Sequence, residues 1–113
     1  DRYEFIKNSK EVMNNVLLCQ MDDKIHSNVD IAMLAKELLK FENVKASFAI
    51  VFLSKRVIGV SARSVNDINV GKIMESLGGG GRATDAACQI KDKSISEVAL
   101  MVIKALKEEE KCE

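Results

Sequence analysis

The sequence has few of the residues that signal a metal centre, a disulfide framework or a membrane span. Its 113 residues include no proline, one histidine and three cysteines. The cysteines are Cys19, Cys88 and Cys112 and form no CxxC pair, so we expect reduced thiols rather than zinc ligands or disulfides. His26 follows a charged stretch and precedes Ser27, which favours a surface residue over a catalytic base. No apolar run is long enough to predict a transmembrane helix.

The chain also has no excess of charge of either sign and few aromatic residues. It has 17 basic and 17 acidic residues, so its formal net charge is zero. This balance argues against binding of long duplex nucleic acid, and no polybasic run predicts a membrane surface. With four Phe, one Tyr and no Trp, no stacking platform for single strands is evident. A small anion or a very short oligonucleotide needs only a local positive patch and stays open.

The length and composition predict one globular domain. Apolar residues make up 47% and charged residues 30% of the chain, an ordinary balance for a single core. The sequence begins at Asp1 rather than at methionine, and we expect it to be part of a longer protein. Residues 1–113 show no linker, no repeat and no internal boundary.

The first part of the chain predicts a helix, a strand and a second helix. Residues 3–15 are expected to be helical and residues 16–21 to form a short buried strand. Ser27 or Asn28 is placed to cap a helix over about residues 29–41. Its apolar positions recur at i, i+3, i+4 and i+7: Ile31, Leu34, Ala35 and Leu38.

The strongest strand signal is the run over residues 46–53, which is apolar on both alternating faces and predicts a covered central strand. Residues 57–63 are expected to return as the second arm of a hairpin. One face of that arm is apolar: Ile58, Val60 and Ala62. The opposite face is small and polar: Gly59, Ser61 and Arg63. The small residues leave room beside Arg63, although an ordinary solvent-facing strand would show the same pattern.

The last part of the chain predicts a helix, a strand and a final helix. Asn69 is placed to cap a helix over residues 70–77, and Gly78 suits its end. A strand then passes through Ala86 and Cys88, and Ser94 opens the final helix with a capping box. Residues 108–113 are expected to be a frayed tail. The fold class is therefore α/β (α+β), a single domain with a four- or five-stranded mixed sheet and helices packed on it.

Between the last two predicted helices lies a run of four glycines, residues 78–81, followed by Arg82. Ordering the run costs about 2–4 kcal/mol more backbone entropy than four alanines would. A compensating use is a concave nest of N–H groups that binds an anion, with the Arg82 guanidinium beside it. A flexible linker or a tight turn is the alternative.

The glycine run belongs to a wider spaced pattern. Ser-Ala-Arg-Ser at residues 61–64, Ile-Asn-Val at 68–70, the glycines and Ala-Ala at 86–87 together resemble the DHH-associated domain of the DHH phosphoesterase superfamily. This is the small C-terminal substrate-binding domain behind an Asp-His-His metal domain, and the resemblance covers about residues 16–107. Ala-Ser-Phe at 46–48 and Gln89 look most like cyclic-di-AMP phosphodiesterases of the GdpP type.

The resemblance implies a phosphate-binding role without catalytic or metal-ligating residues in this chain. The implied ligands of the substrate phosphate are Ser61, Arg63, Ser64, Gly78, Gly79, Gly80, Gly81 and Arg82. The family normally has histidine at the position of Arg82. Arginine keeps its charge near neutral pH, so Arg82 can anchor a phosphate but cannot shuttle a proton.

The same resemblance implies the partners and the setting. The ligand would be an adenine dinucleotide or a short oligonucleotide, and the preceding DHH domain would bind Mn²⁺, with residues 1–15 as a linker helix. The chain alone is expected to have no hydrolytic activity, and it would be a cytoplasmic part of a membrane-anchored phosphodiesterase. The alternatives are the C-terminal domain of a short-oligoribonucleotide exonuclease and a non-catalytic module that forms a homodimer.

Overall fold

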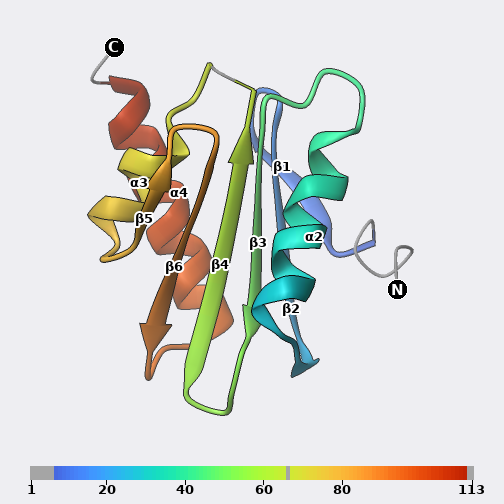
Figure 1. Ribbon diagram of the computed structural model, residues 1–113, viewed down its shortest axis with the longest axis vertical. Coiled ribbons are helices and arrows are strands. Elements are labelled where there is room, and N and C mark those ends of the chain that lie inside the picture. Colours follow the sequence, from blue (N-terminus) through green and yellow to red (C-terminus); the bar gives the residue numbers. More distant parts are fainter. Residues whose placement is uncertain (1–6, 66, 112–113) are drawn as a thin grey trace.

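A computed structural model describes residues 7–65 and 67–111 and shows a single mixed sheet with helices on both faces (Figure 1). The sheet has six strands in the order β1-β2-β3-β4-β6-β5. The strands are β1 (Ser9–Met13), β2 (Val16–Ile25), β3 (Ala46–Phe52), β4 (Val57–Ser64), β5 (Gly80–Arg82) and β6 (Asp85–Lys91). The helices are α2 (Asn28–Leu39), α3 (Val70–Ser76) and α4 (Ile95–Lys111). The α/β class is confirmed, with more strands than the four or five expected.

The helix predicted over residues 3–15 is wrong over residues 9–13. Residues 1–6 lie outside the described part, and Ser9–Met13 forms the edge strand β1, antiparallel to β2. The turn between them places Asn15 at a φ of 66°, a conformation that asparagine tolerates. The carboxylate of Glu11 accepts a 2.8 Å hydrogen bond from the Asn15 N–H. Pairing with β2 therefore overrides the weak apolar periodicity of this segment.

The hairpin of β3 and β4 forms the centre of the sheet, as predicted. Phe48 and Ile50 point toward α3 and α4, whereas Ala49 and Val51 point toward α2, and all four are fully buried. The strand β2 joins β3 in parallel through the crossover helix α2, and the other strand pairs are antiparallel. The apolar face of β4 lies in the same core as Phe48. The strand β4 lies between β3 and β6, so the alternative of a solvent-facing edge does not apply.

His26 is buried rather than at the surface, which corrects the interpretation from the sequence. It follows the last residue of β2, where the chain turns across the end of β3 to begin α2. Its N–H donates a 2.8 Å hydrogen bond to the carbonyl of Phe52. Its Nε2 lies 4.0 Å from Oδ1 of Asp23, and the side chain is 5% exposed. Because this backbone hydrogen bond holds His26 against the end of β3, its ring is enclosed. The polar residues around His26 in the sequence could not predict this burial.

The helix caps agree with the sequence. Ser27 and Asp30 form a reciprocal capping box at α2, and Ser94 and Glu97 form another at α4. These hydrogen bonds hold the pKa of Asp30 and of Glu97 below the usual values, because they favour the charged carboxylates. Asn69 caps α3 by accepting from the N–H of Lys72 at 3.0 Å.

The C-terminal helix is longer than the sequence suggested. The helix α4 continues to Lys111, so residues 108–111 are helical where a frayed tail was expected, and residues 112–113 lie outside the described part. Across the described ranges, 7–65 and 67–111, no helix combines the length and the apolar character needed to cross a membrane.

We expect Phe48→Ala to lower the free energy of unfolding by about 3–5 kcal/mol, because it opens a cavity in the centre of the sheet. Val29→Ala on the outer face of α2, where valine is 71% exposed, is the control and should change stability by less than about 0.5 kcal/mol. Urea unfolding followed by circular dichroism measures both. Equal effects of the two substitutions would contradict this placement of the core.

Candidate functional site

The glycine run ends α3 at Gly78, as predicted, and then continues into an edge strand that the sequence did not indicate. Gly78, at a φ of 90°, ends α3, and its N–H donates to the carbonyl of Glu75 at 3.0 Å. The N–H of Gly79 donates to the carbonyl of Met74 at 2.8 Å, which completes a Schellman motif. Residues 80–82 form β5, antiparallel to β6. The N–H groups of Gly78 and Gly79 are thus used by the helix end and do not contribute to an anion nest.

Close contact with β6 explains why glycine occupies two positions of the run. A Cβ at Gly79 would lie 2.1 Å from the carbonyl oxygen of Ala87. A Cβ at Gly81 would lie 2.6 Å from Cα of Ala86, and the φ of Gly81 is 142°. Gly80 differs, because a Cβ there would meet no atom within 4 Å. The missing side chains at Gly79 and Gly81 therefore allow β5 to lie against β6, and this contact offsets the entropic cost of ordering these glycines.

The strand register places three charged residues in one row across the sheet. Arg63 on β4 is opposite Asp85 on β6, and Asp85 is in turn opposite Arg82 on β5. Ser47 on β3 is opposite Arg63, and its hydroxyl donates to the carbonyl of Ala35 in α2. Because directly opposed residues of antiparallel strands share a face, the whole row lies on the face of the sheet that α2 partly covers.

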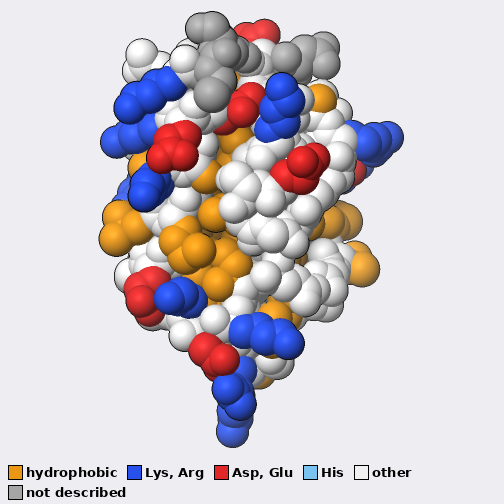
Figure 2. All heavy atoms as spheres, turned by 90° about the vertical axis from the view of Figure 1, so that its left-hand side faces the viewer, with side chains coloured by type: hydrophobic (Ala, Val, Ile, Leu, Met, Phe, Trp, Pro, Cys, Tyr) orange, Lys and Arg blue, Asp and Glu red, His pale blue; other side chains and the backbone are white. Residues whose placement is uncertain are grey.

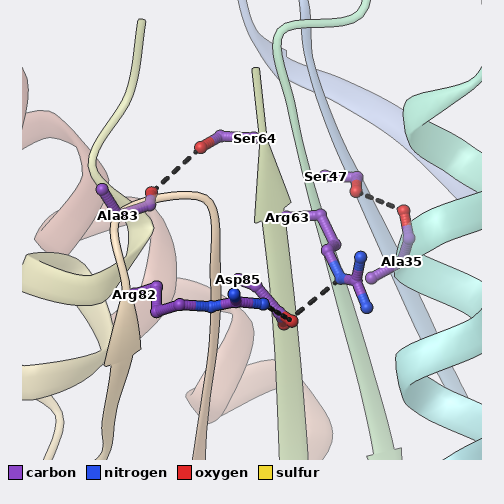
Figure 3. Close-up of polar contacts among 7 residues, drawn as sticks. All are labelled: Ala35, Ser47, Arg63, Ser64, Arg82, Ala83 and Asp85. Atoms are coloured by element: carbon purple, nitrogen blue, oxygen red, sulfur yellow. Dashed lines mark hydrogen bonds and ion pairs between the residues drawn. The ribbon is translucent and has the colours of Figure 1, made fainter. Parts of the chain in front are cut away.

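The two guanidinium groups meet at the Asp85 carboxylate (Figure 3). Nε of Arg63 forms an ion pair with Oδ1 at 3.2 Å, off the angle of a hydrogen bond, and Nη2 of Arg82 donates to Oδ2 at 3.3 Å. The Arg63 side chain is 27% exposed, that of Asp85 34% and that of Arg82 82%. We call these three residues the charged triad. Arg63 is thus held by its surroundings, whereas Arg82 is held mainly by Asp85.

Beside the charged triad lies a row of small residues on the same face. Ser61 is opposite Ala87, and Ala87 is opposite Gly80. Ser61 is buried, Ala87 is exposed and Gly80 is half-buried. The exposed Ala87 and the half-buried Gly80 place no bulky side chain beside the charged triad. We call this row the small-residue floor.

The structure separates the predicted site residues into two groups. The first group lies on one face of the sheet, as the register requires, and consists of Arg63, Arg82, Ser61 and Gly80. Ser64 lies on the opposite face, where its Oγ is 2.6 Å from the carbonyl oxygen of Ile68 and 3.1 Å from that of Ala83. Of the other glycines, Gly78 and Gly79 end a helix and Gly81 packs on Ala86.

Asp85 and Ala87 were missed by the sequence reasoning. The alternation of β6 carries the signal, because Ala86, Cys88 and Ile90 are buried and the residues between them are not. Had that alternation been combined with the register to β4, it would have placed Asp85 beside Arg63. The hairpin of β5 and β6 could not be foreseen, since the glycine run has little strand propensity.

The two cysteines in the described part of the chain lie in the core. Cys88 is buried, and desolvation raises the pKa of its thiol to about 11. Burial also raises the pKa of Cys19. Both thiols are therefore protonated near neutral pH. Within the described ranges no group of three or more His, Cys, Asp or Glu side chains could hold a metal ion. The chemistry that this face offers is the binding of an anion by fixed positive charge.

Comparison with known proteins identifies the family. The family model of the DHHA1 domain matches residues 13–109, which include five of the six strands in full, the last residue of β1, the helices α2 and α3 and most of α4. The chain belongs to the DHHA1 domain family. The N-terminal boundary of the match falls at the end of β1.

The curated relatives of this DHHA1 domain include cyclic-di-AMP phosphodiesterases. It is 44% identical over 85 residues to the cyclic-di-AMP phosphodiesterase PdeA of Listeria monocytogenes. The aligned segment covers 75% of this chain and 13% of PdeA. It is 36% identical over 102 residues to the cyclic-di-AMP phosphodiesterase GdpP of Bacillus subtilis, with 82% of this chain and 16% of GdpP covered. The chain therefore spans less than a fifth of these relatives.

Solved structures share the fold. The pGpG-specific phosphodiesterase PggH of Vibrio cholerae superposes with a TM-score of 0.70 at 17% identity, over 96% of this chain and 38% of PggH. At this identity the likeness concerns the fold alone.

Alanine substitutions at the neighbouring Gly79 and Gly80 should have opposite effects on the stability of the domain. Gly79→Ala places a methyl group against the Ala87 carbonyl and should destabilise the domain by about 1–3 kcal/mol, since the backbone must shift. Gly80→Ala faces open space and should be neutral or stabilise by up to about 1 kcal/mol, because alanine restricts the unfolded chain. Thermal melting of both variants checks the order, and equal losses would contradict the pairing of β5 with β6.

Proposed function

We propose that this DHHA1 domain binds a phosphate group of an adenine dinucleotide on the face formed by the charged triad and the small-residue floor. The proposal is carried by one observation: guanidinium groups from two different strands converge on a single carboxylate. In the longer protein the domain would present that dinucleotide to a preceding metal-dependent domain for hydrolysis. The names of the relatives PdeA and GdpP favour cyclic-di-AMP as the dinucleotide.

The free nitrogens of the two arginines support the binding of a phosphate. The Asp85 carboxylate pairs with Nε of Arg63 and accepts a hydrogen bond from one terminal nitrogen of Arg82. Both terminal nitrogens of Arg63 and the remaining nitrogens of Arg82 stay available. A guanidinium fork matches phosphate oxygens in pairs, which gives directional as well as electrostatic binding. The exposed Arg82 can turn toward a ligand, whereas Arg63 offers a fixed partner.

The distribution of charge supports a small ligand over a long duplex. Figure 2 shows the side of the molecule that carries β5 and α3, with basic and acidic side chains interspersed around a central apolar area. Duplex binding requires many phosphate contacts along a basic stripe. A zero net charge with two clustered arginines fits one phosphate group better.

The reaction itself would depend on residues outside this chain. Mn²⁺ would be held by the preceding DHH domain, and this chain would bind and orient the phosphate. Arg82 stays charged near neutral pH, so it would stabilise negative charge without transferring a proton. We also place the domain on the cytoplasmic side of a membrane-anchored protein.

Removing either guanidinium group should weaken binding of cyclic-di-AMP to this chain. The loss of a charge-assisted hydrogen bond costs roughly 1.5–3 kcal/mol, which corresponds to about 10- to 150-fold in the dissociation constant. We expect Arg63→Ala to approach the upper end and Arg82→Ala the lower end, because Arg82 is far more exposed. Isothermal titration calorimetry measures both.

Arg56→Ala is the matched control, because it removes the same charge from an exposed ion pair with Asp92 at the far end of the sheet. It should bind as the unmodified chain does. Equal affinity of all three variants would contradict the proposed site. A short oligoribonucleotide titrated in parallel tests the alternative ligand, and tighter binding of that oligonucleotide would replace cyclic-di-AMP in the proposal.

A further inference from the structure

We infer that Asp85 determines which kind of phosphate group this face accepts, favouring a singly charged phosphodiester over a doubly charged terminal phosphomonoester. The inference rests on the proposed function and goes further, because it assigns a selective role to a carboxylate inside an anion site. A carboxylate at that place is not needed for attraction. A carboxylate between the two guanidinium groups reduces the attraction for an anion, so its presence there needs another physical explanation.

Asp85 is built into the centre of the row. It lies on β6, between β4 and β5, and each of its oxygens holds one guanidinium group, Oδ1 that of Arg63 and Oδ2 that of Arg82 (Figure 3). Both neighbouring strands fix its backbone by pairing. A ligand that binds the two arginines must therefore lie close to the Asp85 carboxylate.

The local charge follows from these contacts. Two guanidinium groups and one carboxylate leave the charged triad with a net charge of one positive unit. The next two residues on the same face of β6, Ala87 and Gln89, are uncharged. The next charged residue of β6 on that face, Lys91, is six residues away, or about 20 Å along the strand. Solvent ions screen charges beyond about 8 Å at physiological salt, so Asp85 has a direct effect that Lys91 lacks.

Ligand charge then decides the preference. A phosphodiester carries one negative charge, whereas a terminal phosphomonoester carries about 1.5–2 at pH 7. The cost of removing an ion from water rises steeply with its charge, and a site with one net positive charge compensates one negative charge. The repulsion from Asp85 also doubles for the doubly charged ligand, because Coulomb energy is proportional to ligand charge. Asp85 thus opposes the monoester more than the diester.

The test uses two ligands that differ by one charge, adenosine 5′-monophosphate and its methyl ester. Their affinities are measured by NMR titration of the full chain, with the shifted amides assigned to β4, β5 and β6. If Asp85→Asn strengthens binding of the singly charged ester by roughly fivefold, the doubly charged nucleotide should gain roughly 25-fold, since the energies scale with charge. The preference for the ester then falls roughly fivefold.

The ratio of the two affinities separates charge from structure. Any loosening of Arg63 or Arg82 in Asp85→Asn would weaken binding of the doubly charged ligand more than that of the ester, because attraction also scales with ligand charge, so it would shift the ratio in the direction opposite to the loss of Asp85. Asp85→Glu keeps the charge and should keep the ratio of the unmodified chain. Asp92→Asn removes the same charge from the Arg56 ion pair at the other end of β6 and should also leave the ratio unchanged. Asp85→Ser serves as a second neutral variant if Asp85→Asn does not fold.

An unchanged ratio in Asp85→Asn and Asp85→Ser overturns the inference, while binding that is still lost in Arg63→Ala keeps the proposed function. The absence of binding by either ligand and by cyclic-di-AMP overturns both. A ratio that shifts equally in Asp92→Asn assigns the effect to the net charge of the whole chain and overturns the role of Asp85.

Discussion

The backbone of residues 79–81 lies so close to β6 that no side chain fits between them at two positions. This close contact is the constraint on which the candidate site depends. It allows β5 to pair with β6, and the pairing puts Arg82 opposite Asp85. Any residue other than glycine at position 79 or 81 would push β5 outward, and Arg82 would move with it. The glycine run thus serves to let two strands approach closely, and its first residue, Gly78, ends α3.

The charged triad combines a fixed group with a movable one. Arg63 extends from a central strand and is largely enclosed, so its position is set by the sheet. Arg82 extends from an edge strand into solvent and is held by one contact to Asp85. An exposed ion pair is worth little, about 0–1 kcal/mol, so a ligand can exchange with it at small cost. The sheet thus presents one preorganised cation and one adaptable cation to the same anion.

The prediction from the sequence was strongest where one physical signal acted alone. The apolar run of β3, the capping box of Ser94, the stop at Gly78 and a cap of α2 at Ser27 or Asn28 are local features. The structure confirms each of them and assigns the cap of α2 to Ser27. It was weakest where pairing competes with local pattern. The segment of β1 was assigned to a helix and that of β5 was not assigned to a strand, because strand formation there depends on pairing with the neighbouring strand and not on the periodicity or propensity of the segment itself.

The sequence by itself determined the two-sided core of β3 and β4, the ends of the helices and the presence of arginines beside small residues. These follow from periodicity and from capping groups within a few residues of one another. Only the tertiary structure decided that Arg63 and Arg82 meet, that Asp85 lies between them and that Ser64 faces the other way. The reason is the register of β4, β6 and β5, which joins residues about 20 positions apart through backbone hydrogen bonds. A slip of one residue between β4 and β6 would put Asp85 on the opposite face from Arg63 and would break the charged triad.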